Sequence, residues 1–259
     1  MTGGNNPGPG GVMTSTEVHD RAEHETHLTQ IPTPPDLGYR PALDGVRALA
    51  VMLVVAVHVT YVLVPAWAGR WVPGGFLGVD VFFVLSGFLI TTLLLEEHHR
   101  SGRVSLRGFY VRRARRLLPA VGVLLLAHGV LTALIRADLG HEARSAAAVA
   151  LYGANWVIAA GGSLSAGLGH LWSLSVEEQF YMVWPVLLLA ALRCRRPTAV
   201  IVVIAVAGIV WAIGVRAWLW LEGAGWDAIY VRTDARLDEL FMGALLAVTF
   251  RRGWRLPHR

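Results

Sequence analysis

The chain has 259 residues, of which 54% are hydrophobic and 16% are charged, and its mean hydropathy is +0.50. Apolar stretches of membrane-spanning length recur along it, which excludes a soluble globular protein and predicts an all-α, polytopic transmembrane helical bundle. Its net charge of +5 comes from 23 basic residues, all of them arginine. These cluster between the apolar stretches, where membrane topology explains them without a nucleic-acid partner.

Residues 1–38 are rich in Gly, Pro and polar residues, which predicts a disordered cytoplasmic tail before a membrane domain over residues 39–259. We expect about six full spans and one shorter segment, over residues 145–160, that is followed by a Gly/Ser-rich stretch. The predicted spans are residues 41–64, 76–95, 117–135, 176–192, 198–221 and 237–250.

Whether residues 145–160 cross the membrane or re-enter decides the topology of everything after them. A re-entrant segment places 17 arginines on the cytoplasmic side and 6 outside, whereas a crossing segment gives 13 and 10. The positive-inside rule favours the first arrangement, with both chain termini cytoplasmic.

The first predicted span carries two ionisable side chains, Arg47 and His58, eleven residues apart. At ~100° per residue this spacing places both on one helix face, about 16 Å apart along the axis, and an arginine in a span is expected to face a protein interior or a watery cavity. Asp44 lies one turn before Arg47, near the positive helix start. His58 could act as a general base for a hydroxyl. Alternatively, Arg47 snorkels to the interface and His58 hydrogen-bonds a neighbouring helix.

A second polar cluster, GHLWSLSVEEQFYMVWP, enters the span that begins near residue 176. Its polar members are His170, Ser173, Glu177, Glu178 and Tyr181, together with Ser175 and Gln179. Glu177 and Tyr181 are four residues apart and are therefore predicted to be neighbours on one helix face. Alternatively, the Glu177 and Glu178 carboxylates are present because negative charge is favourable at the N-terminus of a helix. That explanation accounts for one carboxylate more readily than for both.

Two further segments hold candidate supporting residues. Ser86 and Gly87, in FFVLSGFLI, would permit close helix approach. Arg232 and Asp234, in YVRTDARLDEL, fit either a functional pair or a solvated turn of mixed charge. The chain contains one cysteine, Cys194, and no zinc-binding or phosphate-cradling motif, so we expect no metal.

These motifs, in this order and spacing, resemble the membrane-bound acyltransferase-3 family. The resemblance covers residues 40–250 and rests on the Arg47 and His58 pair, FFVLSGFLI, FYVRRARRLLP, HLWSLSVEEQFYMVWP and the Arg232/Asp234 segment. It implies a bacterial inner-membrane enzyme that moves an acyl group, commonly acetyl from acetyl-CoA, to a hydroxyl of a carbohydrate, a lipid-linked sugar or an antibiotic. The lipid bilayer, acyl-CoA and such an acceptor would be its partners.

The resemblance also implies roles for individual residues. His58 would be the essential histidine, with Arg47 as its partner and Glu177 as the matching carboxylate. Arg113 and Arg116, with Arg112 beside them, would bind acyl-CoA, whose phosphates suit planar guanidinium groups.

One departure and one rival reading accompany the resemblance. The family's membrane module has more spans than this sequence offers, so we expect either a C-terminally incomplete domain or a wall supplied by another chain, such as a homodimer partner. The rival is a proton-coupled transporter in which Arg47 and His58 form an intramembrane relay. Inverted repeats would favour the transporter, and none is evident in the sequence.

Overall fold

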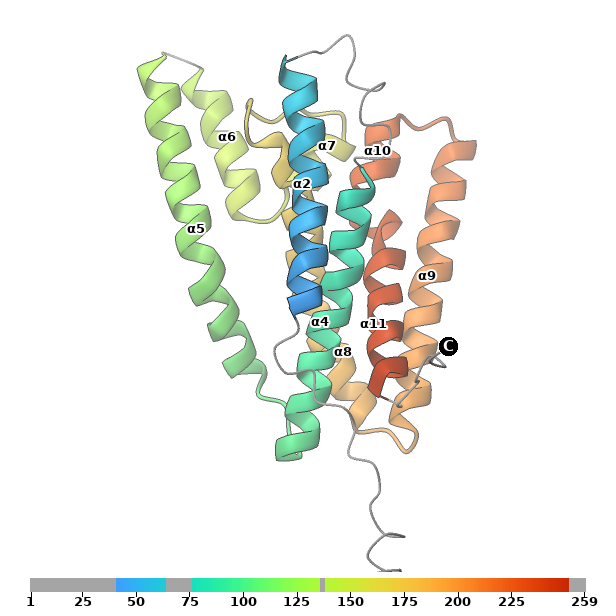
Figure 1. Cartoon of the computed structure of the whole chain (residues 1–259). Coiled ribbons are helices and arrows are strands. Elements are labelled where there is room, and N and C mark those ends of the chain that lie inside the picture. Colours follow the sequence, from blue (N-terminus) through green and yellow to red (C-terminus); the bar gives the residue numbers. More distant parts are fainter. Residues whose placement is uncertain (1–40, 64–75, 136–137, 252–259) are drawn as a thin grey trace, which may run out of the picture. The chain divides into compact units, whose positions relative to one another are not determined.

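The computed structural model describes residues 41–63, 76–135 and 138–251, so the prediction of a disordered tail lies outside the described residues. Every regular element in these ranges is helical, which confirms the predicted all-α class (Figure 1). The helices are α2 (Pro41–Leu63), α4 (Leu77–Ser101), α5 (Leu106–Leu134), α6 (Leu139–Ala150), α7 (Ala154–Ala159), η2 (Gly169–Leu171), α8 (Trp172–Leu192), α9 (Pro197–Leu221), α10 (Trp226–Val231), η3 (Thr233–Ala235) and α11 (Leu237–Arg251).

Four of the described helices, α2, α4, α5 and α9, are long and apolar enough to cross a membrane. The sequence predicted six full spans, and the other two predicted spans correspond to α8 and α11. The first turns of α8 carry Glu177 and Glu178, which lower its apolar character. With 15 residues, α11 is about 22 Å long, shorter than a ~30 Å hydrocarbon core.

The arginine-rich stretch before the third predicted span is helical from the start. We predicted that this span begins at residue 117, yet α5 begins at Leu106 and contains 29 residues. The Ser105 side chain caps it by accepting a hydrogen bond from the backbone N–H of Gly108 at 3.1 Å. Arginine is a good helix former, so polarity marks where the apolar span begins and not where the helix begins.

Residues 145–160 form parts of two short helices instead of one long segment. The first, α6, has 12 residues and is about 18 Å long. Its N-cap carboxylate, Asp138, accepts backbone hydrogen bonds from His141 and Gly140, which lower the pKa of Asp138. In Figure 1, α6 begins at the end of the bundle where α5 finishes and runs back only part of the way before the chain turns into α7.

The core of the bundle lies where α8 packs among α4, α9 and α11. Trp184 is fully buried there, stacks on Phe180 at 5.7 Å between ring centroids, and donates a hydrogen bond to Thr91. The α4 and α11 backbones approach closely at Gly87 and Gly243. This contact confirms the close helix approach predicted for the Ser86 and Gly87 pair.

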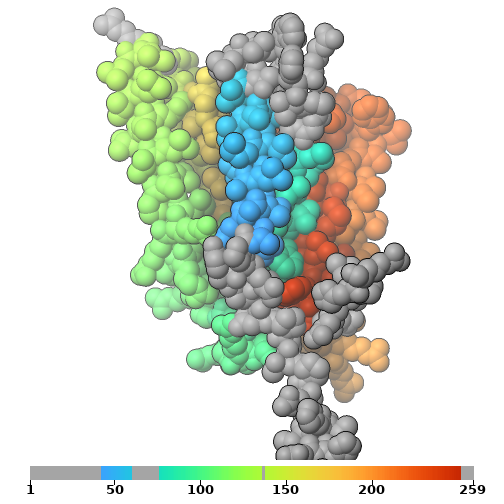
Figure 2. Space-filling view, viewed as in Figure 1, coloured from blue at the N-terminus to red at the C-terminus, as the bar shows by residue number. Residues whose placement is uncertain are grey.

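The helix α2 lies on the surface of the bundle, with α5 to one side and α4 to the other (Figure 2). Large apolar side chains on it are exposed, including Leu49, Met52 and Val55. An exposed apolar face on a helix long enough to span a bilayer is suited to contact with lipid.

Candidate active site

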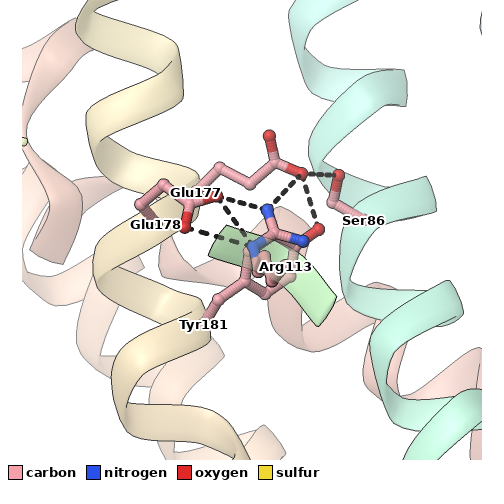
Figure 3. Close-up of polar contacts among 5 residues, drawn as sticks. All are labelled: Ser86, Arg113, Glu177, Glu178 and Tyr181. Atoms are coloured by element: carbon pink, nitrogen blue, oxygen red, sulfur yellow. Dashed lines mark hydrogen bonds and ion pairs between the residues drawn. The ribbon is translucent and has the colours of Figure 1, made fainter. Parts of the chain in front are cut away.

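An arginine from α5 joins two adjacent carboxylates of α8 (Figure 3). The Arg113 Nε donates hydrogen bonds to both carboxylate oxygens of Glu178, at 2.9 and 3.1 Å, and its Nη2 donates to the same group. The Nη2 of Arg113 also lies 3.9 Å from the Glu177 carboxylate. The guanidinium packs over the ring of Tyr181, 3.4 Å from the ring centroid. The two carboxylates of the VEEQ segment are thus held by one cation.

The Glu177 carboxylate receives two hydroxyl donors on the same oxygen. Ser86 of α4 donates one hydrogen bond, and Tyr181, one turn along α8, donates the other at 2.5 Å. The predicted contact between Glu177 and Tyr181 is therefore confirmed. Glu177 is buried, and its carboxylate serves as the hydrogen-bond acceptor for both hydroxyl groups. We call Ser86, Arg113, Glu177, Glu178 and Tyr181 the carboxylate cluster.

A basic cavity of about 470 Å³ lies beside this cluster, between the end of α4 and the start of α5. Arg112, Arg113 and Arg116, for which the family resemblance implies acyl-CoA binding, all line it, and so does Arg100. Arg112 lies at the surface and pairs loosely with Glu97 at 3.4 Å. We call this the basic cavity.

Near the C-terminal end of α2, His58 faces a second histidine, His170. The rings of His58 and His170 meet edge to face, with their centroids 5.9 Å apart. The Nδ1 of His58 lies 2.8 Å from the carbonyl oxygen of Val54. A carbonyl only accepts hydrogen bonds, so Nδ1 carries the proton and Nε2 keeps the lone pair that a general base needs. Burial, with a smaller contribution from His58, lowers the pKa of His170 and favours its neutral form.

The surroundings of Arg47 and His58 differ in part from the protein interior or watery cavity that the sequence predicts for their helix face. Arg47 is half-buried, but His58 is exposed except where it meets His170, so the described residues do not enclose it. Among the described residues, no hydrogen bond or ion pair links Arg47 with His58. Their relative position is fixed by α2, which is continuous between them and places both on one helix face.

Comparison of the sequence with known protein families identifies the family of the chain. The sequence profile described as an acyltransferase domain matches residues 40–255. The chain belongs to this acyltransferase family. No solved structure matches the chain.

The chain is similar to curated proteins of Staphylococcus aureus, Listeria monocytogenes and Bacillus subtilis. A Staphylococcus aureus (strain MSSA476) protein named "Putative O-acetyltransferase" is 37% identical over 216 residues, which is 81% of this chain and 34% of the relative. The "Peptidoglycan O-acetyltransferase OatA" of Listeria monocytogenes is 35% identical over 218 residues, 81% of this chain and 34% of the relative. A Bacillus subtilis protein, YrhL, is 35% identical over 221 residues, 82% of this chain and 33% of the relative. The chain thus spans about a third of the length of these relatives.

The remaining predicted site residues of the chain lie apart from the carboxylate cluster. Ser173 donates a hydrogen bond to the backbone oxygen of His170 at 3.3 Å and so steadies the turn that carries this histidine. Asp44 is exposed on the first turn of α2. Arg232 and Asp234 pair with each other through two hydrogen bonds of 2.9 and 2.7 Å, partly buried beside α9.

The sequence reading missed a second polar network, at the end of the bundle where α9 finishes. Arg236 of the turn before α11 pairs with Asp80 of α4 and with Glu239, and Arg216 of α9 pairs with Asp238. From the sequence, the YVRTDARLDEL segment fits either a functional pair or a solvated turn of mixed charge, and the structure instead places Arg236, Asp238 and Glu239 in a buried network. The signal that could have found it is Arg216 itself, a lone charge in an otherwise apolar helix that requires a partner.

Proposed function

We propose that this chain is the membrane part of an O-acyltransferase that moves an acetyl group from acetyl-CoA to a hydroxyl of a glycan acceptor. The observation that carries the proposal is the arrangement along α8. His170 lies just before this helix against His58, and the carboxylate cluster lies about 10 Å further along, next to the basic cavity. Membership of the acyltransferase family favours this function over a proton-coupled transporter.

The basic cavity supplies the donor site in this proposal. Arg112 and Arg116 present guanidinium groups at its surface, where they suit the phosphates of CoA. Arg113 differs, because its donors already serve Glu178. We therefore assign Arg113 both to the wall of the donor cavity and to the positioning of the α8 carboxylates, and Arg112 and Arg116 to direct phosphate contact.

In the transfer step, His58 Nε2 takes the proton from the acceptor hydroxyl. The hydroxyl oxygen bonds to the thioester carbonyl carbon, the carbon–sulfur bond breaks, and the departing CoA thiolate takes a proton from the His58 imidazolium. The products are the O-acetylated acceptor and free CoA. Arg47 lies on the same helix face as His58, about 16 Å away along α2.

For the topology, we propose that α8 and α11 cross the membrane along with α2, α4, α5 and α9, and that α6 and α7 re-enter from the outer side. The length of α6 and the arginine distribution support this arrangement. It places both termini and the basic cavity on the cytoplasmic side of a bacterial inner membrane, and His58 towards the outer side. A peptidoglycan-type glycan is then a suitable acceptor, in keeping with the name of the Listeria relative.

The test replaces His58 and compares it with a surface histidine. In nanodiscs, His58→Ala should lower acetyl transfer from acetyl-CoA by about 10²–10⁴-fold, the usual loss on removing a general base. The control is His99→Ala, because His99 is exposed at the end of α4 and lies outside the proposed site. Turnover of His58→Ala within twofold of the control, measured as the mass shift of the acceptor, would exclude His58 as the base.

A further inference from the structure

A second cavity, of about 510 Å³, lies at the end of the bundle away from the basic cavity. It is formed by the start of α4, the end of α9, α10 and the start of α11 (Figure 1). Its walls include Phe76, Asp80, Trp226, Tyr230, Arg236 and Glu239. We call it the outer cavity.

One wall of the outer cavity is aromatic and accessible. Trp226 is 64% exposed and stacks on Tyr230, with ring centroids 5.5 Å apart and an angle of 15° between the planes. Phe76 meets the same tyrosine edge to face at 5.6 Å. A flat, exposed indole braced from behind is suited to contact the apolar C–H face of a sugar ring, and aromatic side chains with a polar tip are favoured where one end of a ligand is apolar and the other is wet.

The other wall contains polar atoms that the described part of the protein does not use. The Tyr230 hydroxyl, the Arg236 Nε and one carboxylate oxygen of Glu239 are buried and have no hydrogen-bond partner. Such atoms are rare in folded proteins, and each requires an explanation. Burial raises the pKa of Tyr230 to about 12, so its hydroxyl remains a neutral donor. Two donors and one acceptor, side by side, match the hydroxyl pattern of a saccharide.

The charges around the outer cavity nearly cancel. Arg236 lies between Asp80 and Glu239, and Arg216 is paired with Asp238. Three carboxylates and two guanidinium groups do not attract a phosphate, unlike the arginines of the basic cavity. The balance favours an uncharged ligand.

Aromatic side chains connect the outer cavity to the segment that carries His170. Trp172 packs edge to face against Tyr230 at 5.1 Å and is only two residues along the chain from His170, which contacts His58. A ring held against Trp226 is therefore connected to the proposed base through Tyr230, Trp172 and the turn that carries His170.

We propose that the outer cavity is the acceptor subsite, where Trp226 stacks on a neutral sugar ring and Tyr230, Arg236 and Glu239 bind its hydroxyl groups. This inference rests on the proposed function, because it assigns the acceptor side of the same reaction. Trp226, Tyr230, Arg236 and Glu239 were not among the sequence-predicted site residues.

The experiment measures binding of tetra-N-acetylchitotetraose, a neutral glycan, to the chain in nanodiscs by calorimetry. Trp226→Ala should weaken binding by about tenfold or more, as expected for truncation of a central tryptophan. Tyr230→Phe, which removes only the hydroxyl, should weaken it by about three- to tenfold. Trp220→Ala is the matched control, because Trp220 is an exposed tryptophan of α9 that does not line the cavity.

Equal glycan affinity of Trp226→Ala and the wild type, or no glycan binding by the wild type, would overturn the acceptor subsite. Acetyl-CoA binding is measured on the same samples to test the proposed function separately. Glycan binding without acetyl-CoA binding would reject the transferase and keep the saccharide site. Acetyl-CoA binding without glycan binding would reject only the assignment of the outer cavity as the acceptor subsite.

Discussion

At the scale of single residues, the carboxylate cluster shows what sequence can and cannot provide. Glu177 and Tyr181 could be paired in advance because a helix fixes the geometry of residues four apart. The contacts from Ser86 and Arg113 could not, because these side chains come from α4 and α5, 91 and 64 residues away from Glu177 along the chain. Such contacts depend on how the helices pack, and a hydrophobic pattern does not specify that.

Two adjacent arginines of α5 allow a matched test of this cluster. Arg113 is mostly buried and bidentate to Glu178, whereas the Arg112 side chain is 66% exposed and lies 3.4 Å from Glu97. Arg113→Gln should lower the free energy of unfolding by about 1.5–3 kcal/mol, because it leaves a buried carboxylate without its charged donor. Arg112→Gln should cost less than about 1 kcal/mol, as surface ion pairs do.

The measurement is the denaturation midpoint of the purified protein in one detergent, followed for both variants beside the wild type. If both substitutions cost the same, Arg113 would contribute no more than a surface charge, and its assignment as a positioning residue for Glu178 would be wrong.

At the scale of helices, the close contact of α4 with α11 links packing to the site. Gly87 follows Ser86, which donates to Glu177, so the residue that sets the helix separation adjoins one that holds the carboxylate. A Cβ added at Gly87 would lie 1.9 Å from the backbone oxygen of Leu240, and one added at Gly243 would lie 2.0 Å from that of Val84. Backbone atoms cannot move aside as a flexible side chain can, so the helices themselves would have to separate.

We therefore expect Gly87→Ala to lower stability by about 1–3 kcal/mol, the usual cost of overpacking. It should also lower acetyl transfer, because moving α4 takes the Ser86 hydroxyl away from Glu177. The control is Gly214→Ala in α9, where an added Cβ meets nothing within 4 Å and alanine is the better helix former. Thermal inactivation followed by size-exclusion chromatography compares the two variants. A Gly87→Ala protein as stable as Gly214→Ala would show that the close approach is not required.

At the scale of the whole molecule, hydrophobicity predicted the helices better than it predicted their surroundings. The bounds of α2 and α9 agree with the predicted spans within one residue, since both are long, apolar and ended by clear breaks. The helix α8 is more buried than α2 and α9, yet it is not among the described helices that are apolar enough to cross a membrane. Its polar residues are satisfied by neighbouring helices. In a membrane protein, a buried residue is one that contacts other protein segments. The hydrophobicity of a segment indicates instead how well it suits contact with lipid.

The orientation of the bundle in the membrane can be tested with the native thiol. Cys194 is the single cysteine of the chain, and it is exposed between α8 and α9, flanked by Arg193 and Arg195. If α6 and α7 re-enter without crossing, this turn is cytoplasmic, in agreement with the positive-inside rule. Cys194 should then resist a membrane-impermeant maleimide in intact bacterial cells and react after the membrane is opened.

The matched probe is Glu222→Cys in a Cys194→Ser background, because Glu222 is exposed just past the other end of α9. An α-helix of 25 residues is about 37 Å long, enough to separate its two ends by a full bilayer core. This cysteine should therefore react in intact cells, the reverse of Cys194. Labelling of Cys194 but not of Glu222→Cys in intact cells would mean that the chain crosses once more before α8, which would move the basic cavity and the turn after α8 to opposite sides of the membrane. Because α4, α5 and α8 bring that cavity and the carboxylate cluster together in one bundle, the reversed pattern would also contradict the packing from which the donor site is proposed.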